Sequence, residues 1–259
     1  MSAVEVHVQV EGPEDAPVVV FSPSLGSTLA MWDAQAAALR EHRRVVRYDP
    51  RGHGRSPAPP GPYELADLAD DVVALLDRLG VPAVDFCGLS LGGMTGMQLA
   101  VHHPERIRRL VLCCTAAKLP PEPWADRAAA VRAAGTASIA GTVVQRWLTP
   151  RYAAAHPALV RHLEAMVESA SDEGYAECCD AIRRMDLLDS LERVSAPTLV
   201  VAGRDDPATP PEHAERIAAR IPGARLEVLA PAAHLANLEQ AEALTALLLD
   251  HLDADGKRR

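Results

Sequence analysis

Apolar and polar positions along this chain follow two periods, one typical of strands and one typical of helices. The first segment, VEVHVQV at residues 4–10, alternates strictly, which predicts a strand with one exposed face. Later runs bounded by turn residues predict six more strands, and several of them are almost wholly apolar, as in strands covered on both faces of a parallel sheet. These runs lie at residues 16–22, 43–49, 83–90, 108–115, 197–203 and 224–230.

Segments with apolar residues at three- and four-residue steps separate these runs and predict helices. Residues 63–80 end at a glycine, which is a stop signal for a helix, and residues 210–223 begin with prolines, which a first helical turn tolerates. A third such segment, residues 238–252, follows the last predicted strand. Because strands and helices alternate in this order, we predict an α/β fold with a mainly parallel sheet.

The alternation stops between residues 115 and 197. Only helical patterns interrupted by Pro and Gly occur there, with no convincing strand. We therefore predict an α/β core formed by residues 1–117 and 195–259. A helical cap, residues 118–194, is expected to be inserted between these two parts and to lie over the sheet.

Net charge and hydropathy exclude several classes of partner. The formal net charge is −9, whereas nucleic acids and anionic membranes require a basic surface. The N-terminus lacks the basic start and apolar run of a signal peptide, and no uncharged apolar stretch approaches the ~20 residues of a membrane span. We therefore expect a cytoplasmic protein without nucleic-acid or membrane partners, and nothing in the sequence indicates an oligomeric state.

The chain has five cysteines, an odd number, and none has the C-x-x-C spacing of a metal or redox site. They are Cys87, Cys113, Cys114, Cys178 and Cys179. We interpret them as buried thiols that act as small hydrophobic side chains in a reducing compartment, and we expect no metal site.

The segment GLSLG, residues 88–92, has the pattern G-x-S-x-G between a predicted strand and a helical pattern, LGGMTGMQLAVHH. A serine on a tight strand-to-helix turn projects its hydroxyl above the edge of the sheet, and small flanking residues avoid collisions there. The helix N-terminus behind it favours a developing negative charge. Ser90 is therefore a candidate nucleophile, the alternative being a glycine-rich turn whose serine only caps the helix.

A serine nucleophile needs a general base oriented by a third group, and on this scaffold the chain order is Ser, acid, His. Among ten histidines, His234 alone follows a late strand, in a short loop at the carboxyl edge of the sheet. His53, in the turn RGHGRS, precedes the serine. The acid should also follow a strand, and the end of TLVVAG offers both Asp205 and Asp206. Position in the chain leaves these two acids open.

These residues resemble the α/β-hydrolase superfamily and, within it, the 3-oxoadipate enol-lactonases, over nearly the whole chain. RGHGRS and HPERI occur throughout the superfamily, whereas SPSLGSTLAMW, PPGPY and FCGLSLGGM are similar to the enol-lactonases in particular. The resemblance implies an α/β-hydrolase fold with a helical cap. It also implies a small-molecule lactone as the substrate and no cofactor.

The resemblance assigns roles to single residues. The family acid is the last residue of a G-x-x-D pattern, which in GRDD, residues 203–206, is Asp206. The implied catalytic triad is therefore Ser90, Asp206 and His234. The implied oxyanion hole consists of the backbone N–H groups of Leu25 and Leu91, although Pro-Ser stands where the superfamily usually has His-Gly.

An enol-lactone of this family carries a carboxylate, so we expect a basic anchor for it in the cap. Trp124 and Trp147 are expected either to line the pocket or to pack the cap against the core. The candidate anchors are Arg127, Arg132, Arg146, Arg151, Arg183 and Arg184.

The function implied is hydrolysis of 3-oxoadipate enol-lactone through a serine acyl-enzyme. A serine esterase, or a hydrolase of carbon–carbon bonds, with the same fold is the alternative enzyme. A receptor that keeps the pocket without using Ser90 chemically is the alternative outside enzymes.

Overall fold

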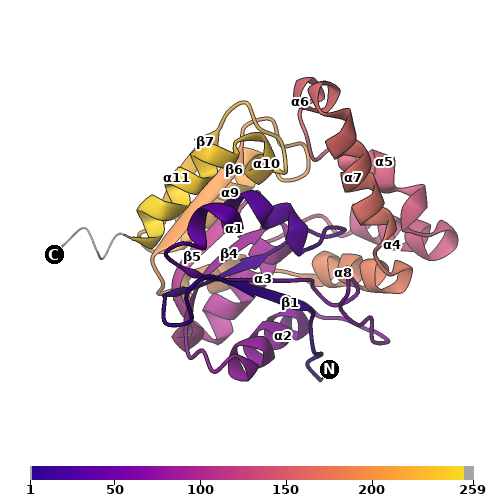
Figure 1. Ribbon diagram of the computed structural model, residues 1–259. Helices are drawn as coiled ribbons and strands as arrows, with labels where there is room; N and C mark the ends of the chain where they lie inside the picture. Colours follow the sequence, from indigo (N-terminus) through magenta and orange to yellow (C-terminus); the bar gives the residue numbers. More distant parts are fainter. Residues whose placement is uncertain (1, 254–259) are drawn as a thin grey trace.

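The computed structural model describes residues 2–253 and contains a seven-stranded sheet covered by helices (Figure 1). The strand order is β1-β3-β2-β4-β5-β6-β7, with β1 antiparallel to β3 and all other neighbours parallel. The predicted α/β fold with a mainly parallel sheet is confirmed. The predicted core also includes residues 1 and 254–259, which lie outside the described residues. The strands are β1 Val8–Glu11, β2 Val18–Ser22, β3 Arg44–Tyr48, β4 Val84–Leu89, β5 Ile107–Cys113, β6 Thr198–Gly203 and β7 Arg225–Leu229.

The central strands are buried along their whole length, as their apolar sequences predict. Every residue of β2, β4 and β6 is buried, because helices cover both faces of the sheet. The first strand is shorter than predicted and begins at Val8 instead of Val4. Its partner β3 ends at Tyr48, opposite Val8, and the Val4 N–H donates instead to Oδ1 of Asp71 at 2.7 Å.

The core helices pack as two layers. The helix α1 contacts α11, and α2 contacts α3 on the other face of the sheet (Figure 1). The predicted helix over residues 238–252 is two helices, separated at Gln240, which leaves the helical conformation. Hydrogen bonds from Asn237 to the Met31 carbonyl and from Gln35 to the Asn237 carbonyl hold the first of them against the core. The core helices are α1 Asp33–Leu39, α2 Leu65–Arg78, α3 Leu91–His102, α9 Pro211–Arg220, α10 Ala236–Glu239 and α11 Ala241–Leu252.

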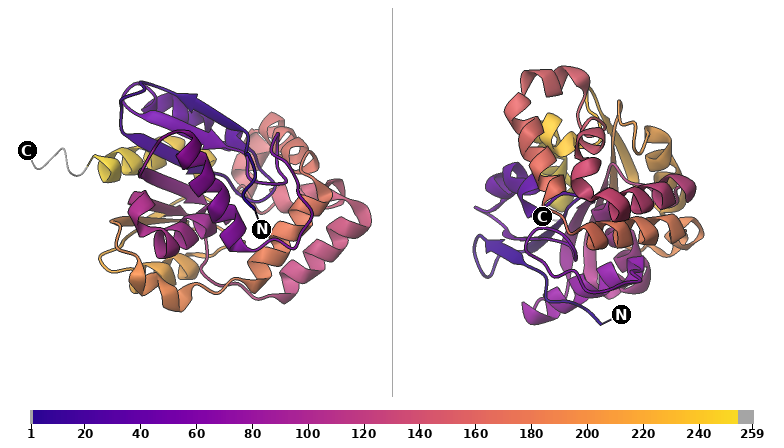
Figure 2. Two further views of the ribbon diagram at one scale, coloured as in Figure 1. Left: turned by 90° about the horizontal axis from the view of Figure 1, so that it is seen from below. Right: turned by 90° about the vertical axis from the view of Figure 1, so that its right-hand side faces the viewer.

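Residues 118–194 are all described, and they form helices without a strand. These helices gather at one end of the molecule, away from the carboxyl end of α11 (Figures 1 and 2). A single β-bridge joins Lys118 to Asp186, whose side chains form an ion pair at 2.6 Å, and we propose that the cap begins and ends near this bridge. The helices are α4 Glu122–Ala134, α5 Ala140–Val144, α6 Pro150–Ala155, α7 Pro157–Glu168 and α8 Asp172–Arg184.

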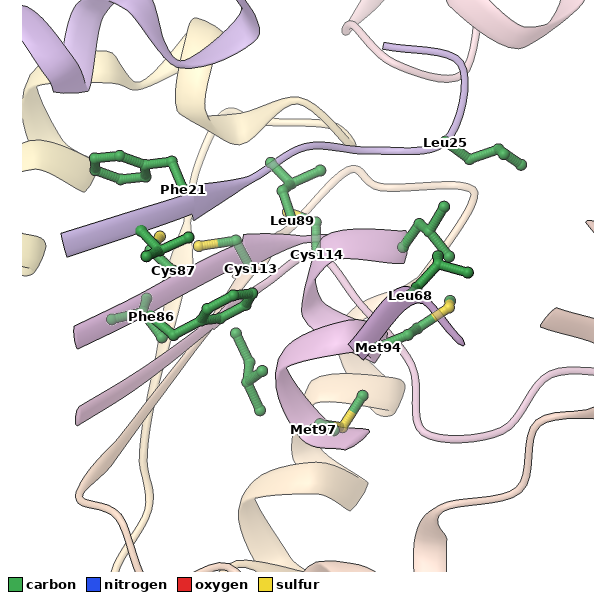
Figure 3. Packing of buried hydrophobic residues seen from close by; sticks show 14 of the residues in the cluster. Phe21, Leu25, Leu68, Phe86, Cys87, Leu89, Met94, Met97, Cys113 and Cys114 are labelled. Carbon is green, nitrogen blue, oxygen red and sulfur yellow. The ribbon is translucent and has the colours of Figure 1, made fainter. Parts of the chain in front are cut away.

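All five cysteines are free and buried, as predicted. Three of them lie in the central core beside Phe86 and Leu89 (Figure 3). Burial raises the pKa of the Cys114 thiol, which therefore stays protonated and apolar at neutral pH. These thiols contribute packing to the core.

The cap meets the core through an unusually close backbone contact. A Cβ atom added to Gly174, in α8, would lie 2.5 Å from the Cα of Gly52, in the turn after β3. The Ser171 N–H also donates to the Gly52 carbonyl at 2.9 Å. Two glycines are therefore required here for the cap to reach the core.

This contact makes an alanine in α8 unfavourable, although alanine normally stabilises a helix. We expect Gly174→Ala to lower the free energy of unfolding by about 1–3 kcal/mol, because the methyl group overlaps the Gly52 backbone. The matched control is Gly141→Ala in α5, where the nearest atom would be 3.8 Å away, and it should stabilise by ~0.5–1 kcal/mol. Urea unfolding of both variants measures the difference, and a stabilising Gly174→Ala would contradict the packing described.

Candidate active site

Ser90 lies on the turn between β4 and α3 in a backbone conformation that non-glycine residues rarely adopt, with φ 56° and ψ −115°. Such a conformation costs about 1–3 kcal/mol, so the surroundings must hold it. The Ser90 N–H donates to the Cys113 carbonyl at 3.0 Å, and the Ser90 carbonyl accepts from Thr115 Oγ1 at 2.7 Å. The Ser90 side chain makes no capping hydrogen bond with α3, so the alternative of a helix cap is wrong.

The two glycines of the G-x-S-x-G pattern are required because a side chain at either position would collide with the neighbouring backbone. A Cβ atom on Gly88 would lie 2.1 Å from the Gly92 carbonyl oxygen. A Cβ atom on Gly92 would lie 2.2 Å from the carbonyl oxygen of Ser22, at the end of β2. The turn can approach its neighbours only without these side chains, which explains the spacing seen in the sequence.

Asp206 and His234 form a buried hydrogen-bonded pair at the carboxyl ends of β6 and β7. Each is 3% exposed, and the Nδ1 atom of His234 lies 2.8 Å from Oδ2 of Asp206. The two loops can meet because residue 203 is a glycine. A Cβ atom at this position would lie only 2.2 Å from the carbonyl oxygen of Ala233. Since Asp206 occupies Nδ1, the Nε2 atom of His234 remains for a second partner. Ser90 and His234 line the same cavity.

Hydrogen bonds keep the Asp206 carboxylate ionised despite its burial. Burial opposes the charge, but His234 and the hydrogen bonds from Thr209 hold the pKa of Asp206 below its ordinary value. Thr209 donates its N–H to Oδ1 at 3.1 Å and its hydroxyl to Oδ2 at 2.8 Å, while the Ala208 N–H donates to Oδ1 at 2.8 Å. Sequence reasoning missed Thr209, because a threonine three residues after an acid has no distinctive pattern.

Asp205 has a different surrounding from Asp206. It is exposed, its N–H donates to the Ala232 carbonyl at 2.8 Å, and its Oδ2 atom accepts from the Ala232 N–H at 3.2 Å. Asp205 therefore holds the loop that carries His234 in place through two hydrogen bonds with Ala232, and neither bond involves the imidazole. The structure thus separates the two acids that chain position alone leaves equivalent.

Of the predicted oxyanion residues, Leu91 directly follows Ser90 and Leu25 lines the same cavity as Ser90. Leu91 is the first residue of α3, where N–H groups have no acceptor within the helix. Leu25 lines the cavity, and within the described chain its N–H donates no hydrogen bond. The neighbouring N–H groups are all engaged: Ser24 with Met31 Sδ, Gly26 with His53 Nε2, Ser27 with the Ser24 carbonyl, Thr28 with Met166 Sδ and Leu29 with Asp49 Oδ1.

A mainly apolar cavity of about 200 Å³ lies between Ser90, His234 and the cap. Trp124 from α4 and the buried Trp147 after α5 both contribute to its wall, so each lines the pocket as well as packing against neighbouring residues. Leu119 and Met94 complete its apolar side. The cavity therefore combines side chains from both parts of the chain.

The six arginines considered as anchors separate into two groups. Arg127 and Arg146 line the cavity, and within residues 2–253 no carboxylate lies at ion-pair distance from either. The other four lie elsewhere: Arg132 pairs with Glu173, Glu177 and Asp180, Arg183 with Asp180, and Arg184 with Glu64, while Arg151 lines a separate hollow beside α6.

Two searches for other kinds of site gave negative results in the described part of the chain. Residues 2–253 contain no group of three or more His, Cys, Asp or Glu side chains arranged to hold a metal ion. Over the same residues, no helix has the length and apolar character needed to cross a membrane.

Because the two acids have different surroundings, replacing each of them by asparagine should affect kcat differently. Asp206→Asn should lower kcat about 10⁴-fold, because an amide does not hold the imidazole in the required tautomer. Asp205→Asn should change kcat less than about threefold, because an amide oxygen still accepts the Ala232 N–H. Steady-state kinetics on an aryl ester measures both, and the reverse order would place the catalytic acid at Asp205.

Comparison with known proteins agrees with this arrangement. A family model described as the alpha/beta hydrolase fold matches residues 17–241. The chain is 42% identical to 3-oxoadipate enol-lactonase 2 of Acinetobacter baylyi, over 90% of this chain and 87% of that protein. It is 31% identical to a protein of Stutzerimonas stutzeri whose name refers to carbamate hydrolysis, over 96% and 95% of the two chains.

Solved structures show the same relationship. The enol-lactonase from Burkholderia xenovorans LB400 superposes with a TM-score of 0.94 and 41% identity, over 96% of both chains. The predicted resemblance and the predicted class of enzyme, a hydrolase, are confirmed. The chain therefore belongs to the α/β-hydrolase family.

Proposed function

We propose that this protein hydrolyses 3-oxoadipate enol-lactone, with Ser90 as nucleophile, His234 as general base and Asp206 as its orienting acid. The observation that carries the proposal is the cavity itself. The histidine of a buried Asp–His pair and a strained serine line a small apolar space, and its cap side presents two arginines that have no carboxylate partner among residues 2–253. The similarity to enol-lactonases over 90% of the chain supports this substrate.

In the first step His234 accepts the Ser90 proton at Nε2 while the serine oxygen attacks the lactone carbonyl. Asp206 keeps the Nδ1 proton in place and stabilises the imidazolium that forms. The N–H groups of Leu25 and Leu91 bind the oxyanion, and each such donor typically contributes ~10²–10³ in turnover.

Collapse of this intermediate opens the ring. The ring oxygen leaves as an enolate, which takes up the proton held at Nε2 of His234 and relaxes to the ketone, so the leaving group is a good one and His234 is again a neutral base. The product of this step is an acyl-enzyme on Ser90. Water activated by His234 then attacks the acyl carbonyl through the same oxyanion hole, and the keto dicarboxylic acid is released.

Arg127 is the proposed anchor for the substrate carboxylate. Its guanidinium carbon lies 4.6 Å from the centroid of the Trp124 ring, and both side chains line the cavity. Stacking on an aromatic face restrains the arginine while leaving its N–H donors available to a planar anion. Arg146 lies at the same cavity but is exposed, so water screens its charge more strongly.

Carbamate hydrolysis is the second candidate, because relatives about 31% identical carry that name. The same triad chemistry serves lactones, esters and carbamates, so the triad does not distinguish them. The distinguishing feature is the arginine pair, which favours a substrate with a carboxylate close to the scissile bond.

A comparison of substrates tests the proposed function directly. We expect kcat/KM for 3-oxoadipate enol-lactone to exceed that for uncharged aryl esters and alkyl carbamates by at least about 100-fold, since the ion pair contributes only to the charged substrate. Spectrophotometric rates on the three substrates give the ratio. A preference for the aryl ester or the carbamate would reject the lactonase assignment and leave the triad standing.

Removing the anchor should affect only the charged substrate. We expect Arg127→Gln to raise KM for the enol-lactone roughly 10- to 100-fold, which corresponds to the loss of one charge-assisted hydrogen bond, and to change aryl-ester kinetics less than about threefold. The matched control is Arg132→Gln on the same helix, whose side chain pairs with three carboxylates away from the cavity. Equal effects of Arg127→Gln on both substrates would reject the anchor.

A further inference from the structure

The turn RGHGRS, residues 51–56, carries a buried histidine to which the proposed mechanism assigns no role. His53 is 1% exposed and lies between the oxyanion loop, residues 23–28, and the cap helix α8. Its ring centroid is 6.3 Å from that of Tyr175. Because burying an imidazole is unfavourable without hydrogen-bond partners, we asked which groups its two nitrogens contact.

The two contacts define the protonation state of His53. Its Nδ1 atom lies 3.0 Å from the carbonyl oxygen of Arg51, which can only accept, so Nδ1 carries the proton. Its Nε2 atom is therefore the acceptor for the Gly26 N–H at 2.9 Å. Burial lowers the pKa of His53, against opposing contributions from the Arg51 carbonyl and Asp49, and this favours the neutral ring that the pattern requires.

Gly26 directly follows Leu25, the proposed oxyanion donor. A hydrogen bond from the Gly26 N–H fixes the plane of the peptide between the two residues, since that peptide is rigid. Gly26 has φ 78°, and an added Cβ atom would lie 3.0 Å from the Tyr175 ring, so the chain turns sharply here against α8. The Leu25 N–H belongs to the preceding peptide, whose Ser24 carbonyl accepts from the N–H and the hydroxyl of Ser27. The contact with His53 fixes the next peptide, so it restrains the Leu25 N–H through the backbone torsions of Leu25.

The turn that carries His53 is itself held rigidly. Arg51 donates to both oxygens of Asp71 at 2.7 Å, and the pair is fully buried. On the other side, the Gly52 carbonyl accepts from the Ser171 N–H of the cap at 2.9 Å. The imidazole is thus fixed from the core and from the cap before it meets the oxyanion loop.

We propose that His53 is a positioning residue of the oxyanion hole, which directs the Leu25 N–H into the cavity by accepting the Gly26 N–H at Nε2. This inference rests on the proposed function only in that Leu25 is taken as an oxyanion donor. It applies to any ester substrate that passes through a tetrahedral oxyanion on Ser90.

Two amide substitutions separate the two hydrogen bonds of the imidazole. The side-chain oxygen of His53→Gln reaches the Nε2 position and can accept the Gly26 N–H. The shorter side chain of His53→Asn reaches only the Nδ1 position, where it can donate to the Arg51 carbonyl but leaves Gly26 without an acceptor. Both variants remain polar, and they differ in the one contact that the proposal uses.

The readouts are aryl-ester kinetics and the inhibition constant of an arylboronic acid, which forms a tetrahedral adduct with an active-site serine. For His53→Asn we expect kcat to fall roughly 10- to 100-fold with KM within about threefold, because a displaced donor acts on the transition state. Boronate affinity should fall by a similar factor. His53→Gln should retain kcat and boronate affinity within about threefold of the unsubstituted protein.

His251→Asn serves as the matched control. His251 is also buried, in α11, and its Nε2 atom lies 3.2 Å from the Pro197 carbonyl oxygen; neither residue is among those that line the cavity. This variant should lower the melting temperature and leave kcat and boronate affinity unchanged. Equal kcat values for His53→Asn and His53→Gln would overturn the proposal, as would a loss of kcat without a loss of boronate affinity.

A second measurement does not depend on substitution. Nitrogen-15 NMR of the histidine side chains should show His53 as the neutral tautomer protonated at Nδ1, and the opposite tautomer would overturn the proposal. The test of the proposed function is independent of the test of His53. If the unsubstituted protein opens aryl esters but no enol-lactone, the lactonase assignment fails, while the comparison of His53→Gln with His53→Asn still decides the role of His53.

Discussion

The hydrogen bond between Asp206 and His234 is the interaction on which the rest of the site depends. It requires the loops after β6 and β7 to approach so closely that Gly203 has no room for a side chain beside Ala233. It also requires a buried carboxylate to stay ionised, which Thr209 and Ala208 secure with three hydrogen bonds. Without this pair the imidazole would have no defined tautomer, and the strained turn at Ser90 would have no chemical use.

The cap and the core each contribute different residues to the site. The core supplies the serine, the acid, the base and the proposed oxyanion donors, all at the carboxyl edge of the sheet. The cap supplies Trp124, Trp147 and the two arginines, which close the cavity and give it a positive charge. In the proposed mechanism, chemistry and substrate selection therefore come from different parts of the chain, which approach each other closely at Gly52 and Gly174.

The oxyanion loop departs from the family pattern but keeps the backbone group that the proposed mechanism uses. Pro-Ser stands where the superfamily usually has His-Gly, yet the N–H of Leu25, beside the cavity, has no acceptor among residues 2–253. Its neighbours bind a methionine sulfur on one side and an imidazole on the other. The proposed donor is a backbone group, and the Ser24 carbonyl of the same peptide accepts from the N–H and the hydroxyl of Ser27.

The sequence alone determined the fold class, the strand-to-helix turn at Ser90 and the late position of His234, because these follow from hydrophobic period and local spacing. It also suggested the buried state of the cysteines. It did not show the break at Gln240 or the shortened first strand, since both depend on contacts with distant residues.

Chain position left Asp205 and Asp206 equivalent, and the family resemblance implied Asp206. Only the tertiary structure showed the different contacts of the two acids, the location of Arg127 and Arg146 at the cavity, and the partners of Thr209 and His53. These features depend on which residues lie close together in the folded chain, or on which way the side chains of neighbouring residues point. Hydrophobic period and local spacing do not contain this information.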